Sequence, residues 1–149
     1  MVAFINSSLV EPARDVVGDT EEQLNLARDQ AADKRWATRE ALAGKLKDMR
    51  TKLESAAASE DEKVAVKGAV KGALQALREM EAERARLLAV AQEEEAAAQE
   101  GACEWEGAEQ QDWLNEAEEW QEEIEALEEE EKEIAALRHE VLDLRKYLV

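Results

Sequence analysis

The 149-residue chain carries a formal net charge of −18, with 37 acidic residues against 19 basic ones. Charged residues make up 38% of it and aromatic residues 4%, a composition typical of long exposed helices and coiled coils and not of a compact globule. Its single cysteine, Cys103, excludes an internal disulfide framework and favours a reducing, intracellular setting, either cytoplasm or an organelle lumen.

Residues 1–19 are predicted to form an N-terminal arm. The first ten residues lack a basic leading region and a long apolar run, so they indicate neither a secretory signal nor a membrane span. A transit peptide removed ahead of this sequence stays an open alternative. The segment Thr20-Glu21-Glu22-Gln23 has the form of a capping box, which predicts that a helix starts near residue 20.

The predicted first helix covers residues 20–55 and carries an apolar stripe at spacings of 4, 3 and 4, made of Leu42, Leu46, Met49 and Leu53. Ser59 and Glu62 repeat the capping pattern, so a second helix is expected over residues 60–100. A short connection between helices favours antiparallel neighbours, and residues 20–100 are therefore predicted to form a helical hairpin.

Two glycines, Gly68 and Gly72, lie one turn apart near the start of the second predicted helix. Each costs about 1 kcal/mol relative to alanine inside a helix. Two interpretations stay open, a seam of small residues that allows close approach of a neighbour, and a weak point where the helix kinks.

Gly101 and Gly107 predict a third break, followed by a long C-terminal helix with the strongest regular signal in the chain. Apolar residues recur at every seventh position from Trp113 to Leu148. The second apolar position of each heptad lies on one side of this series before residues 128–132 and on the other side after them. We expect this seam to mediate a homodimer or higher oligomer, with docking against the second helix of the same chain as the alternative. The predicted oligomerisation seam comprises Trp113, Trp120, Ile124, Leu127, Ile134, Leu137, Val141, Leu144 and Leu148.

The whole net charge can be assigned to one stretch, residues 87–131, here called the acidic segment. It contains eighteen Asp or Glu and no Lys or Arg, and three of the four tryptophans. Its like charges repel one another along a helix, whereas residues 28–52 carry a local charge of +4 that could relieve the repulsion. The functional interpretation is a docking surface for a basic protein, and the structural alternative is a solvated face whose tryptophans are core. The predicted partner-binding residues are Trp105, Glu104, Glu106, Glu109 and Asp112.

The sequence gives no positive signal for an enzyme. The only histidine, His139, is expected to face solvent on a helix, and the acidic neighbours of Cys103 disfavour its thiolate. No phosphate-binding loop, no metal-ligand spacing and no nucleophile–base pattern occurs, so no catalytic residue, cofactor or metal is predicted. The negative charge also argues against nucleic acid as a partner.

Residues 103–107 and 115–120, which hold Trp105 and Trp120 among carboxylates, resemble part of a known protein family. The family is the small, conditionally disordered chloroplast linker that gathers glyceraldehyde-3-phosphate dehydrogenase and phosphoribulokinase. The resemblance covers about eighteen residues and implies a flexible regulatory linker or inhibitor of metabolic enzymes. The chain departs from the family pattern where Leu114 follows Trp113, and its lone cysteine rules out switching by an internal disulfide.

Together these patterns predict an all-α protein, either an elongated antiparallel helical hairpin or a three-helix bundle, with coiled-coil seams and a long C-terminal helix. Residues 101–149 would form an acidic, Trp-bearing segment and that helix. The expected function is non-enzymatic, a scaffold, adaptor or assembly factor that presents an acidic face to a basic protein. The alternative is a purely structural subunit or filament component, for which the seams alone suffice.

Overall fold

The computed structural model describes residues 17–55 and 58–148, and every regular element within these ranges is helical. Three long helices, α1 (Val17–Glu54), α2 (Glu60–Glu104) and α3 (Ala108–Arg145), are followed by a short 3-10 helix, η2 (Lys146–Leu148). The predicted all-α class is confirmed. The predicted arm of residues 1–19 lies outside the described residues except for 17–19, which belong to α1. Thr20 therefore lies within α1 and not at its N-cap.

The chain divides into two compact units, residues 1–40 and residues 41–149, with the division inside α1. The described part of the first unit is the N-terminal portion of α1. It leaves three large apolar side chains more than half exposed, Leu24, Leu26 and Trp36. Thr38 Oγ1 donates to the carbonyl of Lys34 one turn earlier, at 2.9 Å. Between residues 22 and 40 only Arg39 is buried, at 8% exposed, and the apolar core described below belongs to the second unit.

The start of α2 follows the predicted capping pattern. Ser59 is the N-cap residue, and its Oγ accepts a hydrogen bond from the backbone N–H of Glu62 at 3.1 Å. The same hydroxyl donates to Glu62 Oε1 at 3.4 Å. Three acidic side chains in the first turn, Glu60, Asp61 and Glu62, also favour this end of the helix dipole.

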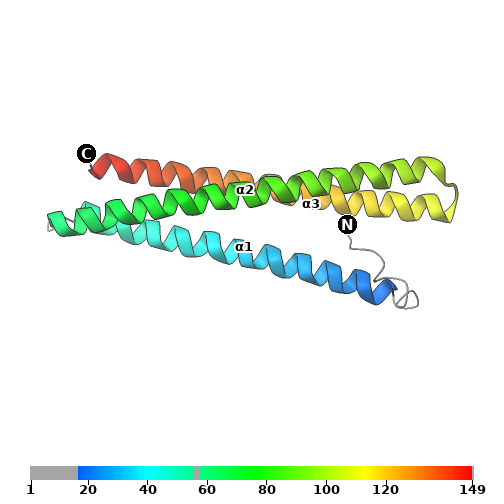
Figure 1. Ribbon diagram of the computed structural model, residues 1–149, viewed down its shortest axis with the longest axis horizontal. Coiled ribbons are helices and arrows are strands. Elements are labelled where there is room, and N and C mark those ends of the chain that lie inside the picture. Colours follow the sequence, from blue (N-terminus) through cyan, green and yellow to red (C-terminus); the bar gives the residue numbers. More distant parts are fainter. Residues whose placement is uncertain (1–16, 56–57, 149) are drawn as a thin grey trace. The chain divides into compact units, whose positions relative to one another are not determined.

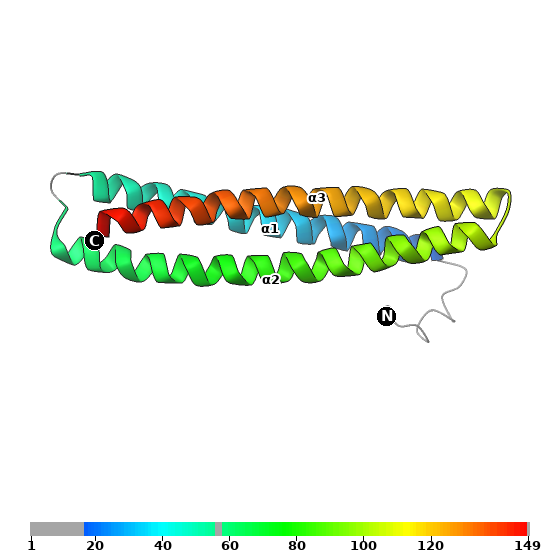
Figure 2. The same cartoon turned by 90° about the horizontal axis from the view of Figure 1, so that it is seen from above.

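In the second unit, α2 and α3 lie side by side and run in opposite directions (Figures 1 and 2). With 45 residues, α2 is about 68 Å long at 1.5 Å per residue. A group of buried apolar residues from α2, α3 and the end of α1 forms a first core, which we call cluster 1. Its members are Leu42, Leu46, Val66, Val70, Ala73, Leu77, Ile134, Leu137, Val141 and Leu144.

The apolar stripe predicted on the first helix is part of cluster 1. Leu42 and Leu46 are buried, and Met49 and Leu53 pack against the cluster as partly buried side chains. The spacings of 4, 3 and 4 keep these four side chains on one face of α1, and that face contacts cluster 1. Burial of large aliphatic side chains here stabilises the unit by about 1.5–3 kcal/mol each.

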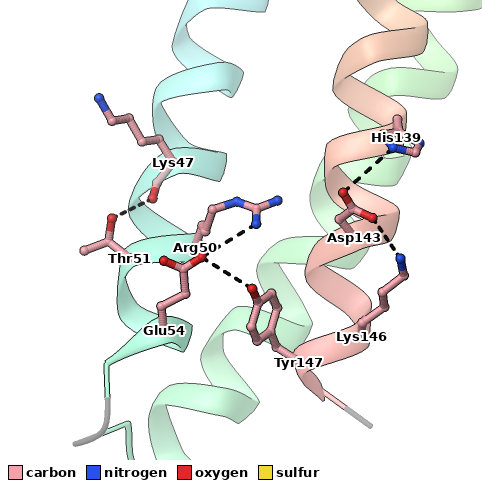
Figure 3. Close-up of polar contacts among 8 residues, drawn as sticks. All are labelled: Lys47, Arg50, Thr51, Glu54, His139, Asp143, Lys146 and Tyr147. Carbon is pink, nitrogen blue, oxygen red and sulfur yellow. Dashed lines mark hydrogen bonds and ion pairs between the residues drawn. The ribbon is translucent and has the colours of Figure 1, made fainter.

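Polar contacts at the end of cluster 1 connect α1 with η2 (Figure 3). Tyr147 in η2 donates from its hydroxyl to Glu54 Oε1 in α1 at 3.4 Å, and Arg50 lies 3.7 Å from the same oxygen. On α3, Asp143 accepts from Lys146 Nζ at 3.1 Å. The Tyr147–Glu54 contact places η2 beside the last turn of α1.

Further along the α2–α3 pair lies a smaller core, cluster 2, made of Ala91, Ile124 and Leu127. Leu87, Leu88 and Trp120 pack against it as partly buried side chains. Ala91 and Ala98 are both about 1% exposed, so small residues of α2 face larger ones of α3 along this half of the pair. The larger side chains of α3 thus fill the space beside the small residues of α2.

The two glycines near the start of α2 do not allow close packing within the described chain. Gly68 and Gly72 are both exposed, and a Cβ atom built at either position would meet nothing within 4 Å. The interpretation of an intrachain seam of small residues is therefore wrong for this structure. α2 is one continuous helix through both positions.

Candidate functional site

The predicted break between the second and third helices is a turn of three residues, Trp105, Glu106 and Gly107. Gly107 has a φ of +66°, a left-handed conformation that glycine adopts without steric cost. The side-chain amide of Gln110, in the first turn of α3, donates to the carbonyl oxygen of Ala102 at 3.1 Å. That bond satisfies one of the free carbonyls at the end of α2 and fixes the reversal of the chain.

The turn brings the five predicted partner-binding residues to one end of the α2–α3 pair. We call this set the acidic tip: Glu104, Trp105, Glu106, Glu109 and Asp112. Trp105 is 48% exposed, and all four carboxylate residues are exposed. No Lys or Arg occurs between residues 87 and 131, so no base from the neighbouring turns of either helix compensates these charges. An apolar anchor surrounded by uncompensated carboxylates is chemically suited to a basic protein surface.

The tryptophan next in sequence has a different environment. Trp113 is partly buried, and its indole ring lies directly over Gly101 of α2. A Cβ atom at Gly101 would lie 2.6 Å from Cδ2 of that ring, which is shorter than any normal contact. Gly101 was predicted to open the break, but it lies inside α2 as a buried residue, and the break begins at Trp105.

The glycines of α2 provide a matched test of these contacts. We expect Gly101→Ala to destabilise the second unit by about 1–3 kcal/mol, because the new methyl group must displace the Trp113 indole. Gly68→Ala should instead stabilise it by about 1 kcal/mol, since alanine is the better helix former and its methyl meets nothing. Urea unfolding followed by circular dichroism measures both changes. Equal effects of the two substitutions would contradict the close approach of Gly101 and Trp113.

The predicted oligomerisation seam is covered by the chain itself. Six of its members, Ile124, Leu127, Ile134, Leu137, Val141 and Leu144, are buried, and the other three, Trp113, Trp120 and Leu148, are partly buried. The seam packs on α2 and, in cluster 1, also on the end of α1. The homodimer was expected because an unpaired stripe would expose these side chains, and one chain already covers them. The homodimer itself stays a prediction.

A charged layer between the two clusters was not predicted. Arg84 of α2 is 5% exposed, and its guanidinium donates to Glu81 from Nη2 at 2.8 Å and from Nε at 3.3 Å. Its Nη2 also lies 3.8 Å from Glu131 Oε1 of α3, and the neighbouring Glu130 is 8% exposed. The signal for this layer was present in α2, where Val70, Leu77, Arg84, Ala91 and Ala98 recur at intervals of seven.

These contacts shift the ionisation of the layer. The hydrogen bond from Arg84 lowers the pKa of Glu81, and the charges of Arg84 and Arg138 act in the same direction. The same hydrogen bond raises the pKa of Arg84 above its ordinary value, with further support from Glu131 and Glu130. Glu130 also coincides with the position where the sequence predicted that the seam changes sides.

The remaining chemistry of the described residues is sparse. Residues 17–55 and 58–148 contain no group of three or more His, Cys, Asp or Glu side chains able to hold a metal ion. His139 Nε2 lies 3.8 Å from Asp143 Oδ2 on the exposed side of α3, and Cys103 is an exposed free thiol. Among these same residues, none of the helices is long and apolar enough to cross a membrane.

Comparison with known proteins adds no family to these observations. No protein-family model, no curated protein and no solved structure matches the chain.

Proposed function

We propose that the chain is a non-enzymatic interaction protein whose acidic tip docks on a basic surface of another protein. The observation that carries this proposal is the exposure of Trp105, which belongs to neither cluster and projects from a turn surrounded by carboxylates. Trp113 and Trp120, in contrast, are partly buried against α2. The roles that fit such a protein are scaffold, adaptor or assembly factor in a reducing intracellular compartment.

In this proposal the α2–α3 pair acts as an antiparallel coiled coil that holds the tip away from the rest of the second unit. The seam residues recur at heptad spacing on both helices, which supports this assignment. A rigid rod that ends in a fixed turn presents Trp105 without a large loss of conformational entropy on binding. The exposed carboxylates would accelerate encounter with a basic partner and make the rate sensitive to salt.

Trp105→Ala should weaken binding to the basic partner while leaving the fold unchanged. A buried aromatic anchor typically contributes about 2 kcal/mol or more, which corresponds to roughly a 30-fold increase in Kd. The partner is first captured from the source cell with the wild-type chain and identified by mass spectrometry, and binding is then measured by calorimetry. Trp36→Ala is the matched control, because Trp36 is similarly exposed, at 54%, but lies outside the acidic segment.

The melting temperature of each variant separates binding from folding. We expect Trp105→Ala to have the same melting temperature as the wild type. Trp120→Ala should have a lower one, because Trp120 packs on cluster 2. If Trp105→Ala and Trp36→Ala bind the captured partner equally well, Trp105 is not the anchor.

A further inference from the structure

A second surface of the same unit has properties that complement the acidic tip. A groove of about 360 Å³ lies between the last turns of α1 and the first turns of α2. Its apolar lining includes Met49, which is half-buried, and Ala65, Val66 and Ala69 of α2. Lys45 and Lys52 line it from α1, with Asp48 between them and Glu62 on α2. Glu62 is already engaged by the N-cap hydroxyl of Ser59.

Next to the groove, α2 has two glycines at which no side chain covers the helix backbone. Gly68 and Gly72 follow Ala65 and Ala69 by three residues each, so they lie on the same side of the helix. Nothing lies within 4 Å of a Cβ atom at either position. An incoming side chain from another molecule could therefore approach the α2 backbone closely here.

The four charged residues that line the groove cancel one another, but the stretch of chain that contains them has the opposite sign to the tip. Residues 41–72 contain seven Lys or Arg and five Asp or Glu, a local charge of +2, whereas the acidic segment accounts for −18. About 50 Å of continuous helix separates Ala69 from Glu104 at 1.5 Å per residue. This separation exceeds the Debye length of about 8 Å at physiological ionic strength, so salt screens the electrostatic interaction between the two surfaces of one chain.

The same length of helix prevents a chain from placing its tip in its own groove. We propose that the acidic tip of one copy docks in the groove of a second copy. The Trp105 indole would lie on Met49 and the alanines, with Glu104 and Glu106 beside Lys45 and Lys52. The proposal uses the tip that the proposed function assigns to a basic partner, and it adds a second copy of this chain as a ligand of that tip.

Such a contact joins two different surfaces, so each pair of copies keeps one free tip and one free groove. Head-to-tail contacts of this type continue into open chains, or into rings where the geometry closes. Wild-type protein should therefore form species larger than a dimer as its concentration rises. Binding of a basic partner at the tip should reverse this assembly, because both ligands need Trp105.

Complementation of two defective variants tests the head-to-tail contact. The first variant is Trp105→Ala, which retains the groove, and the second is Lys45→Glu/Lys52→Glu, which retains the tip. Sedimentation velocity of each variant alone, up to a few hundred micromolar, should show association at least about 30-fold weaker than wild type. An equal mixture should form heterodimers but no assemblies of three or more copies, since only one tip and one groove in each pair remain intact.

The control is Lys47→Glu/Lys71→Glu, which reverses two charges of the same helices outside the groove lining, and should associate like wild type. A wild-type chain that stays monomeric throughout the concentration range would overturn the proposal, as would a mixture that recovers no heterodimer. Neither result affects the proposed function, which depends on capture of a basic partner. Conversely, loss of head-to-tail assembly in Trp105→Ala with unchanged partner capture would sustain this contact and reject the proposed function.

Discussion

Leu144→Glu is expected to unfold most of the second unit. Leu144 is fully buried in cluster 1, so the substitution removes a large aliphatic side chain and places a carboxylate among apolar neighbours. Loss of the leucine packing alone costs about 2–5 kcal/mol, and an unpaired buried carboxylate adds further destabilisation. A domain with a stability of about 5–15 kcal/mol would lose much or all of it. The measurement is helicity by circular dichroism through a denaturant titration.

The matched control is Leu142→Glu, two residues away on α3, where the leucine is 43% exposed. We expect this variant to unfold at nearly the same denaturant concentration as the wild type, because its carboxylate remains solvated. The comparison also tests how the seam is covered. If the seam paired two chains and not three helices of one chain, Leu144→Glu would give a folded monomer, and wild-type stability would rise with protein concentration.

Arg84→Leu should raise the stability of the second unit, in contrast to Leu144→Glu. Arg84 is the buried member of its ion pairs, and its Nη1 is buried without a hydrogen-bond partner, whereas Glu81 and Glu131 are 32% and 57% exposed and stay solvated when the guanidinium is removed. Leucine therefore removes the cost of burying the guanidinium without leaving either carboxylate desolvated. Arg84 lies between the two clusters, and a leucine there would join them into one apolar seam. We therefore expect a higher denaturant midpoint, and a pKa of Glu81 that returns toward its ordinary value because its hydrogen-bond donor is lost.

Arg86→Leu is the control for this substitution. Arg86 lies two residues away, and its Nη2 is 2.6 Å from Glu83 Oε1, but its side chain is 62% exposed. Exposed pairs of this type contribute about 0–1 kcal/mol, so the unfolding midpoint should move little. A large loss of stability in Arg84→Leu, greater than that in Arg86→Leu, would show that the buried pair stabilises the fold.

The same substitution tests whether the charged layer sets the alignment of α2 and α3. A single polar residue at a core heptad position can fix the register of two helices, because other alignments bury it without its partners. Spin labels at the exposed positions Gln92 and Gln121, in a Cys103→Ser background, report the distance between the helices. We expect a narrow distance distribution with Arg84 and a broader one with leucine. Equal widths would mean that packing of the two clusters alone sets the register.

The sequence by itself determined the elements that depend on local spacing and local chemistry. The apolar stripe from Leu42 to Leu53, the Ser59 cap and the heptad position from Trp113 to Leu148 each predicted a helix or a boundary that the structure contains. Exposure of Trp105 followed from its place in a break outside the heptad series. These features are readable because a helix repeats every 3.6 residues and its ends need specific side chains.

Only the tertiary structure decided which surfaces meet. The heptad seam could pair with another chain or with α2, and the spacing is the same in both cases. Gly101 and Gly68 are indistinguishable as helical glycines until Trp113 is placed over one and nothing over the other. The heptad series from Val70 to Ala98 places Arg84 on the buried stripe of α2, but which side chains of α3 it meets depends on the alignment of the two helices. Periodicity specifies which face of a helix is buried, but the partner of that face is fixed by packing between residues far apart in the chain.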